Sequence, residues 1–236
     1  MRSIKTSNIK GVGNSPIISL NHYHNQLLEF KEFSQIKEEF FNRVGYSEIY
    51  EIADFLRTAK TANASRFSEE NLIKLFTRIN ELTDPVRSGG NVVVEEVKTI
   101  LDVLGSLKYK KYQLQELRIG NLVGVFNRQE NLGSRSISRF LKSCSSLSYD
   151  KNELEIDGEK LNGKVNLQFA NFSLDEKIGL LNSMARFEYG FGEEELPPAF
   201  RRVSQDVLER ISDCSADQVS SYLSSMTRMN LTEERR

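Results

Sequence analysis

Apolar residues recur along the chain in a pattern typical of amphipathic helices. Between Val97 and Leu107 the apolar side chains stand at helical spacing, and Tyr109 follows just beyond. The same frame returns forty residues later and is followed by Tyr149. Each such stretch contains an apolar or aromatic doublet, whose second residue we use as a marker. The markers are Leu56, Leu101, Leu141, Leu181 and Leu223, with separations of 45, 40, 40 and 42 residues.

Other helical stretches lie between the marked ones, so each unit predicts a pair of helices. We expect the intervening helices at residues 67–82, 113–126 and 197–211. Ser68, Ser173 and Ser215 each stand just before acidic residues, where a hydroxyl can cap a helix N-terminus. A helix pair cannot bury its apolar face alone, and neighbouring pairs must therefore stack. The prediction is an all-α fold, an alpha-solenoid of about five helix-pair repeats of 40–45 residues.

One segment departs from this pattern, at residues 151–171. It contains the turn signals Asp157-Gly158 and Asn162-Gly163, with apolar residues on both sides. We therefore expect a short hairpin or loop insertion there, in place of a second helix.

The first 28 residues differ in charge from the rest of the chain. They contain Arg2, Lys5 and Lys10 but no acidic residue, and the first carboxylate is Glu29. A basic, Ser-containing leader without an apolar core is typical of an organelle import segment. The alternative is a basic tail that carries no address. We expect a basic N-terminal arm or targeting segment at 1–28, a helical-repeat domain at 29–236, and a location on the matrix side of mitochondria.

The composition limits the kinds of partner and location that the chain can have. The net charge is -1 although 28% of residues are charged, so any contact with nucleic acid has to be local. No run of about 18 apolar residues is present, and we expect no membrane span. Cys144 and Cys214 have no paired spacing and are expected to be core residues.

We find no constellation of residues that predicts an enzyme. His22 and His24 are the only histidines and both lie in the arm. The glycines near Val12 lack the Gly-Lys-Ser/Thr ending of a phosphate-binding loop. We therefore expect no catalytic residue, no cofactor and no metal.

Two stretches show the repeat best, SLDEKIGLLNSMA at 173–185 and SADQVSSYLSSM at 215–226. They resemble the octotricopeptide and heptatricopeptide repeats of FAST-kinase-like and RAP-domain proteins. The resemblance covers about residues 45–231 as a pattern and does not extend to a RAP domain. It implies an organellar protein that contacts RNA or belongs to an RNA-containing assembly such as the mitochondrial ribosome.

From these observations we expect a non-catalytic structural or assembly component of a mitochondrial ribonucleoprotein, with the mitochondrial ribosome as the leading assembly. The alternative is a lineage-specific accessory subunit of a respiratory complex or ATP synthase. The partners would be protein subunits, together with ribosomal RNA bound without sequence-specific readout. Basic residues, some beside aromatic rings, supply the candidates for RNA contact. These candidates are Lys108, Tyr109, Lys110, Lys111, Tyr112, Arg135, Arg139, Lys142, Arg201 and Arg202.

Overall fold

The computed structural model describes residues 33–62, 67–86, 92–107, 109, 111–147, 149, 151–187 and 196–230. Within these ranges the chain forms α-helices and short 3-10 helices and no strand, which confirms the prediction of an all-helical chain. The predicted arm at 1–28 lies outside the described residues, and so do Lys108 and Lys110.

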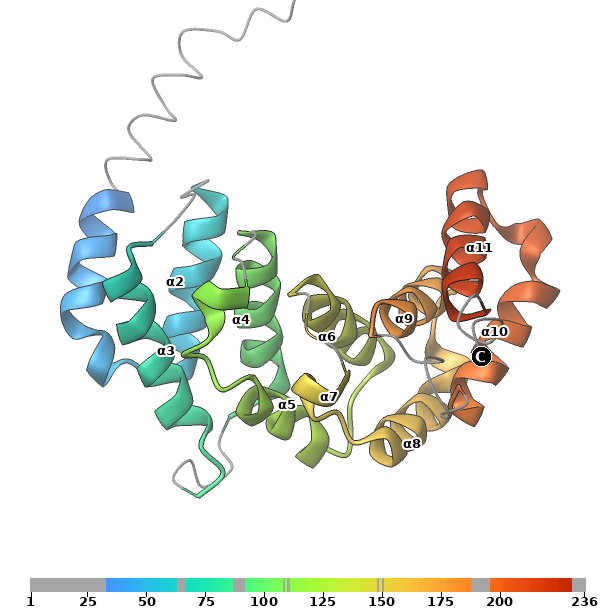
Figure 1. The fold of residues 1–236 in the computed structure, drawn as a ribbon, viewed down its shortest axis with the longest axis horizontal. Helices are drawn as coiled ribbons and strands as arrows, with labels where there is room; N and C mark the ends of the chain where they lie inside the picture. The colour runs from blue at the N-terminus through green and yellow to red at the C-terminus, as the bar shows by residue number, and fades with distance from the viewer. Residues whose placement is uncertain are drawn as a thin grey trace, which may run out of the picture.

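The longer helices alternate between two rows that follow an arc (Figure 1). The first row lies on the inner side of the arc, and each of its helices contacts the next one along the row. It consists of α2 (Ile49–Thr61), α4 (Val94–Ser106), α6 (Ser134–Ser146), α9 (Leu174–Arg186) and α11 (Ala216–Asn230). The second row consists of α3 (Glu69–Thr83), α5 (Ile119–Arg128), α8 (Gly158–Gln168) and α10 (Pro198–Glu209).

Shorter segments connect the two rows, and one further helix covers the N-terminal side of α2. This covering helix spans residues 33–43. The short helices are η1 (Val44–Tyr46), η2 (Lys111–Leu114), α7 (Lys151–Leu154), η3 (Phe169–Asn171) and η4 (Ile211–Asp213). Five phenylalanines pack where the covering helix meets α2, with the rings of Phe40 and Phe55 stacked at 3.8 Å between centroids. This aromatic contact shields one end of the first row from water.

The marker leucines lie where adjacent first-row helices meet. Leu56, Leu101, Leu141 and Leu181 are each 0% exposed, because the next helix pair covers them. Leu223 on α11 is 55% exposed, since no described helix packs on that side. The period found in the sequence therefore corresponds to the spacing of successive helix interfaces.

The predicted helix starts at the three serines are confirmed. The backbone N–H of Asn71 donates to Ser68 Oγ at 3.3 Å. Ser173 forms a reciprocal capping box with Glu176, and the N–H of Gln218 donates to Ser215 Oγ at 3.3 Å. Each serine satisfies a backbone N–H that the first helical turn leaves without a partner.

Asparagine side chains link successive helices of the second row. On α3, the Asn80 amide donates to Glu116 O at 2.7 Å and accepts from Arg118 N at 2.8 Å. On α5, the Asn127 amide repeats this geometry with Glu155 O at 3.1 Å and Asp157 N at 3.4 Å. In both cases the amide bridges two backbone groups just ahead of the next second-row helix.

The predicted hairpin or loop insertion at 151–171 is wrong, because α7, α8 and η3 occupy these residues. Asp157 acts as an N-cap, accepting from Lys160 N at 3.0 Å, so the Asp-Gly pair begins a helix instead of closing a hairpin. Leu161 and Val165 are buried at helical spacing. Asn162 lies inside α8, and its Oδ1 accepts from Ala199 N at the start of α10 at 2.8 Å.

The helix predicted at 113–126 begins later than expected. Residues 111–114 form η2, and α5 starts only at Ile119. Leu114 and Leu117 are buried on either side of the break, so apolar burial continues although the helix does not. Periodicity alone therefore could not locate this boundary.

We predict that Asn127→Ala lowers the free energy of unfolding by about 1–3 kcal/mol, because two backbone groups lose their amide partner. Urea denaturation measures this change. The control is Asn121→Ala on the same helix, because its half-buried side chain forms no bridge to another helix among the described residues. Equal stability of the two variants would show that the amide bridge contributes nothing.

We also predict opposite effects for alanine at two glycines of the first row. A Cβ at Gly105 would lie 1.9 Å from Ser146 Oγ and 3.0 Å from Ser146 Cβ. Gly105→Ala should therefore destabilise the fold by about 1–3 kcal/mol through steric overlap between α4 and α6. A Cβ at Gly179 meets only Ser138 Oγ, at 3.7 Å, so Gly179→Ala should stabilise by about 0.5–1 kcal/mol. Thermal melts that shift in the same direction for both variants would contradict this difference.

Candidate functional site

One continuous polar surface runs across all five first-row helices. It consists of the residues six and two positions before each marker and one and five positions after it, none of which is buried. We call this surface the open face. Its residues are Tyr50, Asp54, Arg57 and Thr61 on α2; Glu95, Thr99, Asp102 and Ser106 on α4; Arg135, Arg139, Lys142 and Ser146 on α6; Asp175, Gly179, Asn182 and Arg186 on α9; Asp217, Ser221, Ser224 and Arg228 on α11.

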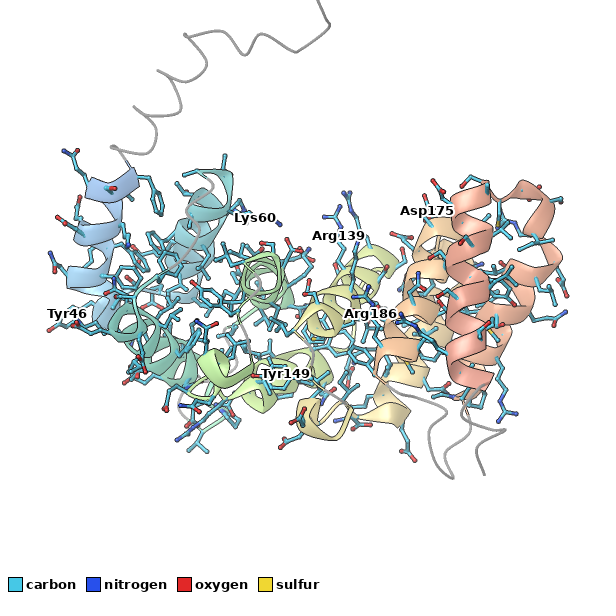
Figure 2. All side chains as sticks on the ribbon, turned by 45° about the horizontal axis from the view of Figure 1, so that its top comes forward. Tyr46, Lys60, Arg139, Tyr149, Asp175 and Arg186 are labelled. Carbon is cyan, nitrogen blue, oxygen red and sulfur yellow. The ribbon has the colours of Figure 1, made fainter. Side chains whose placement is uncertain are left out.

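Polar contacts cross the open face from one helix to the next. Ser136 Oγ on α6 donates to Glu95 Oε1 on α4 at 2.6 Å. The Gln218 amide on α11 donates to the Asp175 carboxylate on α9 in the equivalent place. Figure 2 shows Lys60, Arg139 and Asp175 along the same edge of the first row.

Most carboxylates of α2 and α4 on this face have a basic partner. Asp54 pairs with Arg57, and Lys60 Nζ lies 2.6 Å from Asp102 Oδ2. Partial burial raises the pKa of Glu95, but hydrogen bonds from Lys98 and Ser136 outweigh this effect. Together with the positive charges of Lys98 and Arg139, they hold the Glu95 pKa below its usual value. The acidic side of the face is therefore largely neutralised within the chain.

The structure brings three of the predicted RNA-contact residues together. Arg135, Arg139 and Lys142 are exposed on one side of α6 at i, i+4 and i+7. None of the three forms an ion pair within the described part of the chain. We call these residues the cationic stripe. Arg139 acts on Glu95 through its charge without forming an ion pair, and all three side chains are exposed.

The candidate segment 108–112 is only partly described. Tyr109 is 6% exposed, and its hydroxyl accepts from Phe67 N at 3.0 Å. Its ring is packed between helix pairs and presents no open face to a base, which corrects its placement among the RNA contacts. Lys108, Lys110 and the side chains of Lys111 and Tyr112 lie outside the described residues.

Arg201 and Arg202 lie on α10 in the second row, away from the cationic stripe. Arg201 Nε donates to Leu196 O at 2.9 Å. The Arg202 guanidinium carbon lies 3.9 Å from the centroid of the Phe169 ring, a cation–π contact. These two arginines make local contacts within the chain and do not converge with the stripe.

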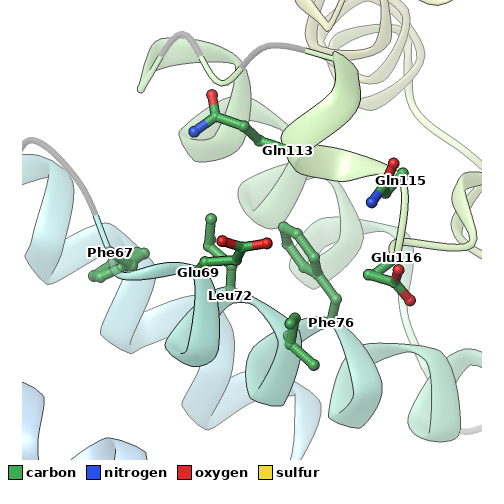
Figure 3. Close-up of a pocket in the computed structure, with 8 residues that line it drawn as sticks. Phe67, Glu69, Leu72, Phe76, Gln113, Gln115 and Glu116 are labelled. Atoms are coloured by element: carbon green, nitrogen blue, oxygen red, sulfur yellow. The ribbon is translucent and has the colours of Figure 1, made fainter.

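A pocket with a volume of about 340 Å³ lies between α3 and residues 113–116 (Figure 3). Its floor is apolar, with Phe76 fully buried, whereas Glu69, Gln115 and Glu116 stand exposed at the rim. Sequence reasoning did not find this pocket, since its two walls are separated by almost forty residues. A pocket with an apolar floor and a carboxylate rim can hold an amphipathic group. Its lining residues include no nucleophile paired with a base.

The remaining ionisable groups do not form a chemical centre within the described ranges. No three His, Cys, Asp or Glu side chains there cluster as metal ligands. Burial raises the pKa of the Cys144 thiol, and Cys214 is half-buried. No helix of the described ranges combines the length and hydropathy needed to cross a bilayer.

Comparison of the chain with protein-family models, curated proteins and solved structures gives no match. Of the open-face residues, sequence analysis named Arg135, Arg139 and Lys142 as candidate contacts and missed the others. Gly179 is one of those that it missed. It occupies the frame position on α9 that Arg139 occupies on α6, which is the signal that could have identified it.

We predict that Tyr109→Phe destabilises the fold by about 1–3 kcal/mol, because the buried N–H of Phe67 loses its acceptor. Thermal or urea unfolding of the full chain measures this effect. Tyr46→Phe is the matched control, since Tyr46 is 89% exposed. An unchanged stability for Tyr109→Phe would mean that its hydroxyl has no structural role.

Proposed function

We propose that the chain is an alpha-solenoid of about five helix-pair repeats. The support comes from contacts that recur in the same repeat frame. Ser136–Glu95 and Gln218–Asp175 join successive first-row helices, while Asn80 and Asn127 join successive second-row segments. Recurrence of a polar contact, in addition to an apolar period, is what a stack of related repeats requires.

The function that we propose for this stack is a non-catalytic structural or assembly component of a mitochondrial ribonucleoprotein, with the mitochondrial ribosome as the leading assembly. The observation that carries the proposal is the open face, a polar surface continuous over five helices. Extended surfaces of this kind bind macromolecules along their length. The resemblance to organellar repeat proteins supplies the compartment.

In this proposal, RNA contact does not read bases. The residue directly after the marker is Arg57, Asp102, Lys142, Asn182 or Ser224 in successive repeats. A repeat protein that reads one base per repeat presents the same kind of side chain at the same position each time. Protein subunits are therefore the main proposed partners.

A second candidate is an accessory subunit of a respiratory complex or ATP synthase. The specific observation in its favour is that charge alternates over α4, α6 and α9 on the open face. At the position six before the marker, Glu95, Arg135 and Asp175 follow one another. Such alternation complements another protein surface better than it complements a uniform polyanion.

We predict that the tagged full chain, recovered from the matrix fraction of purified mitochondria, co-migrates with ribosomal subunits in a density gradient. Ribonuclease treatment should release it, and affinity purification without the nuclease should recover ribosomal proteins. Recovery of respiratory or ATP-synthase subunits regardless of nuclease would favour the second candidate. Recovery outside mitochondria would contradict both.

A further inference from the structure

The cationic stripe groups, on the central part of the open face, three cations without an ion pair among the described residues. Arg135, Arg139 and Lys142 are exposed, and no carboxylate of the described residues lies within 4.0 Å of their nitrogens. In contrast, Glu95 and Asp102 on the preceding helix are paired with lysines. A ligand attracted to this face therefore meets three such cations above α6, whereas α9 and α11 each present one, Arg186 and Arg228.

The stripe is one helix wide. On one side α4 presents paired carboxylates, and on the other side α9 presents Asp175, which accepts from Gln218. Packed helix axes are about 8–10 Å apart, so the side chains of α4 and α9 lie close on either side of the stripe. A broad polyanion would extend beyond the stripe onto carboxylate-bearing helices.

The positions of the charges on neighbouring helices also indicate whether a ligand runs across the first row or along the α6 axis. A strand that runs along the first row at the level of Arg135 would also cross Glu95 and Asp175. At this level a phosphate on either side of α6 would lie near a carboxylate, which weakens binding of RNA across the row there. A ligand aligned with the α6 axis instead meets all three cations, at rises of about 6 Å and about 4.5 Å.

We propose that an acidic helical segment of a partner protein lies along α6 and pairs with Arg135, Arg139 and Lys142. A helix with carboxylates at i, i+4 and i+7 has the same rises and can match every cation of the stripe. This inference rests on the proposed function, since it names the partner chemistry of the same open face.

Gly179 leaves Arg139 accessible from the α9 side of the docking surface, because glycine has no side chain. It occupies the position on α9 equivalent to Arg139 on α6, and a Cβ there would lie 3.7 Å from Ser138 Oγ. The guanidinium of Arg139 therefore has no neighbouring side chain at this level of α9. A carboxylate introduced at Gly179 would compete with an external acidic helix for Arg139.

The test uses the full chain and a fluorescein-labelled, alanine-rich peptide of about 18 residues, long enough to form a helix. The peptide carries Glu at i, i+4 and i+7, and a second peptide carries Gln at these positions. A single-stranded oligoribonucleotide of the same net charge is the third probe. Fluorescence anisotropy at low ionic strength measures binding to the original chain and to Arg139→Gln, Gly179→Glu and Gly179→Gln.

We expect the Glu peptide to bind the original chain and Gly179→Gln equally, and to bind Arg139→Gln roughly threefold more weakly. Gly179→Glu should weaken the peptide at least as much, while its melting temperature stays at or above that of the original chain. The Gln peptide should not bind. Gly179→Gln is the matched control, since it adds a side chain of the same shape without the charge.

Two results would overturn the inference. If the oligoribonucleotide binds more tightly than the Glu peptide and loses affinity in Arg139→Gln, the stripe binds RNA. If all variants bind the Glu peptide alike, the stripe is not its docking surface. In either case co-migration with ribosomal subunits remains a separate measurement, so failure of the docking inference is distinguishable from failure of the proposed function.

Discussion

The fold depends on the burial of the apolar doublet of each first-row helix where that helix meets the next one along the row. Four marker leucines are fully buried in this way, whereas Leu223, which has no following helix pair among the described residues, is half exposed. Transfer of a leucine side chain out of water contributes about 1.5–3 kcal/mol, and the contribution recurs at each interface. Because each pair contacts mainly its neighbours, the stability of the chain is distributed along the arc and no single central core dominates it.

Burial of one helix side exposes the other, and this accounts for the open face. In every first-row helix the positions six and two before the marker and one and five after it point away from the second row. Surface polar contacts such as Ser136–Glu95 contribute little to stability. They favour one position of a helix along the axis of its neighbour. The Asn80 and Asn127 amides do the same for the second row, where they satisfy backbone groups ahead of a helix start.

The sequence pattern predicted the all-helical chain, the interface spacing and the serine caps, because each of these follows from local chemistry. The sequence pattern gave a wrong prediction where the same short motif is compatible with two local structures. Asp157-Gly158 resembles a hairpin turn, yet the aspartate caps α8, since burial of Leu161 and Val165 favours a helix there. Bridges such as Asn127 to Glu155 could not be predicted, because their partners are far apart in the sequence. The hydrogen bond from Phe67 N to the Tyr109 hydroxyl is another such contact, because it joins residues 42 positions apart.

The location of the cationic stripe shows how a stack of similar helices can carry a specific function. Residues at the marker positions are constrained by packing, so side chains that recognise a partner can vary only on the open face. On α4 those side chains are acidic and paired, and on α9 the equivalent of Arg139 is Gly179. Arg135, Arg139 and Lys142 form no ion pair with the described neighbouring helices, and mutual repulsion among them slightly opposes helix formation. An acidic partner of the kind proposed above would offset this repulsion.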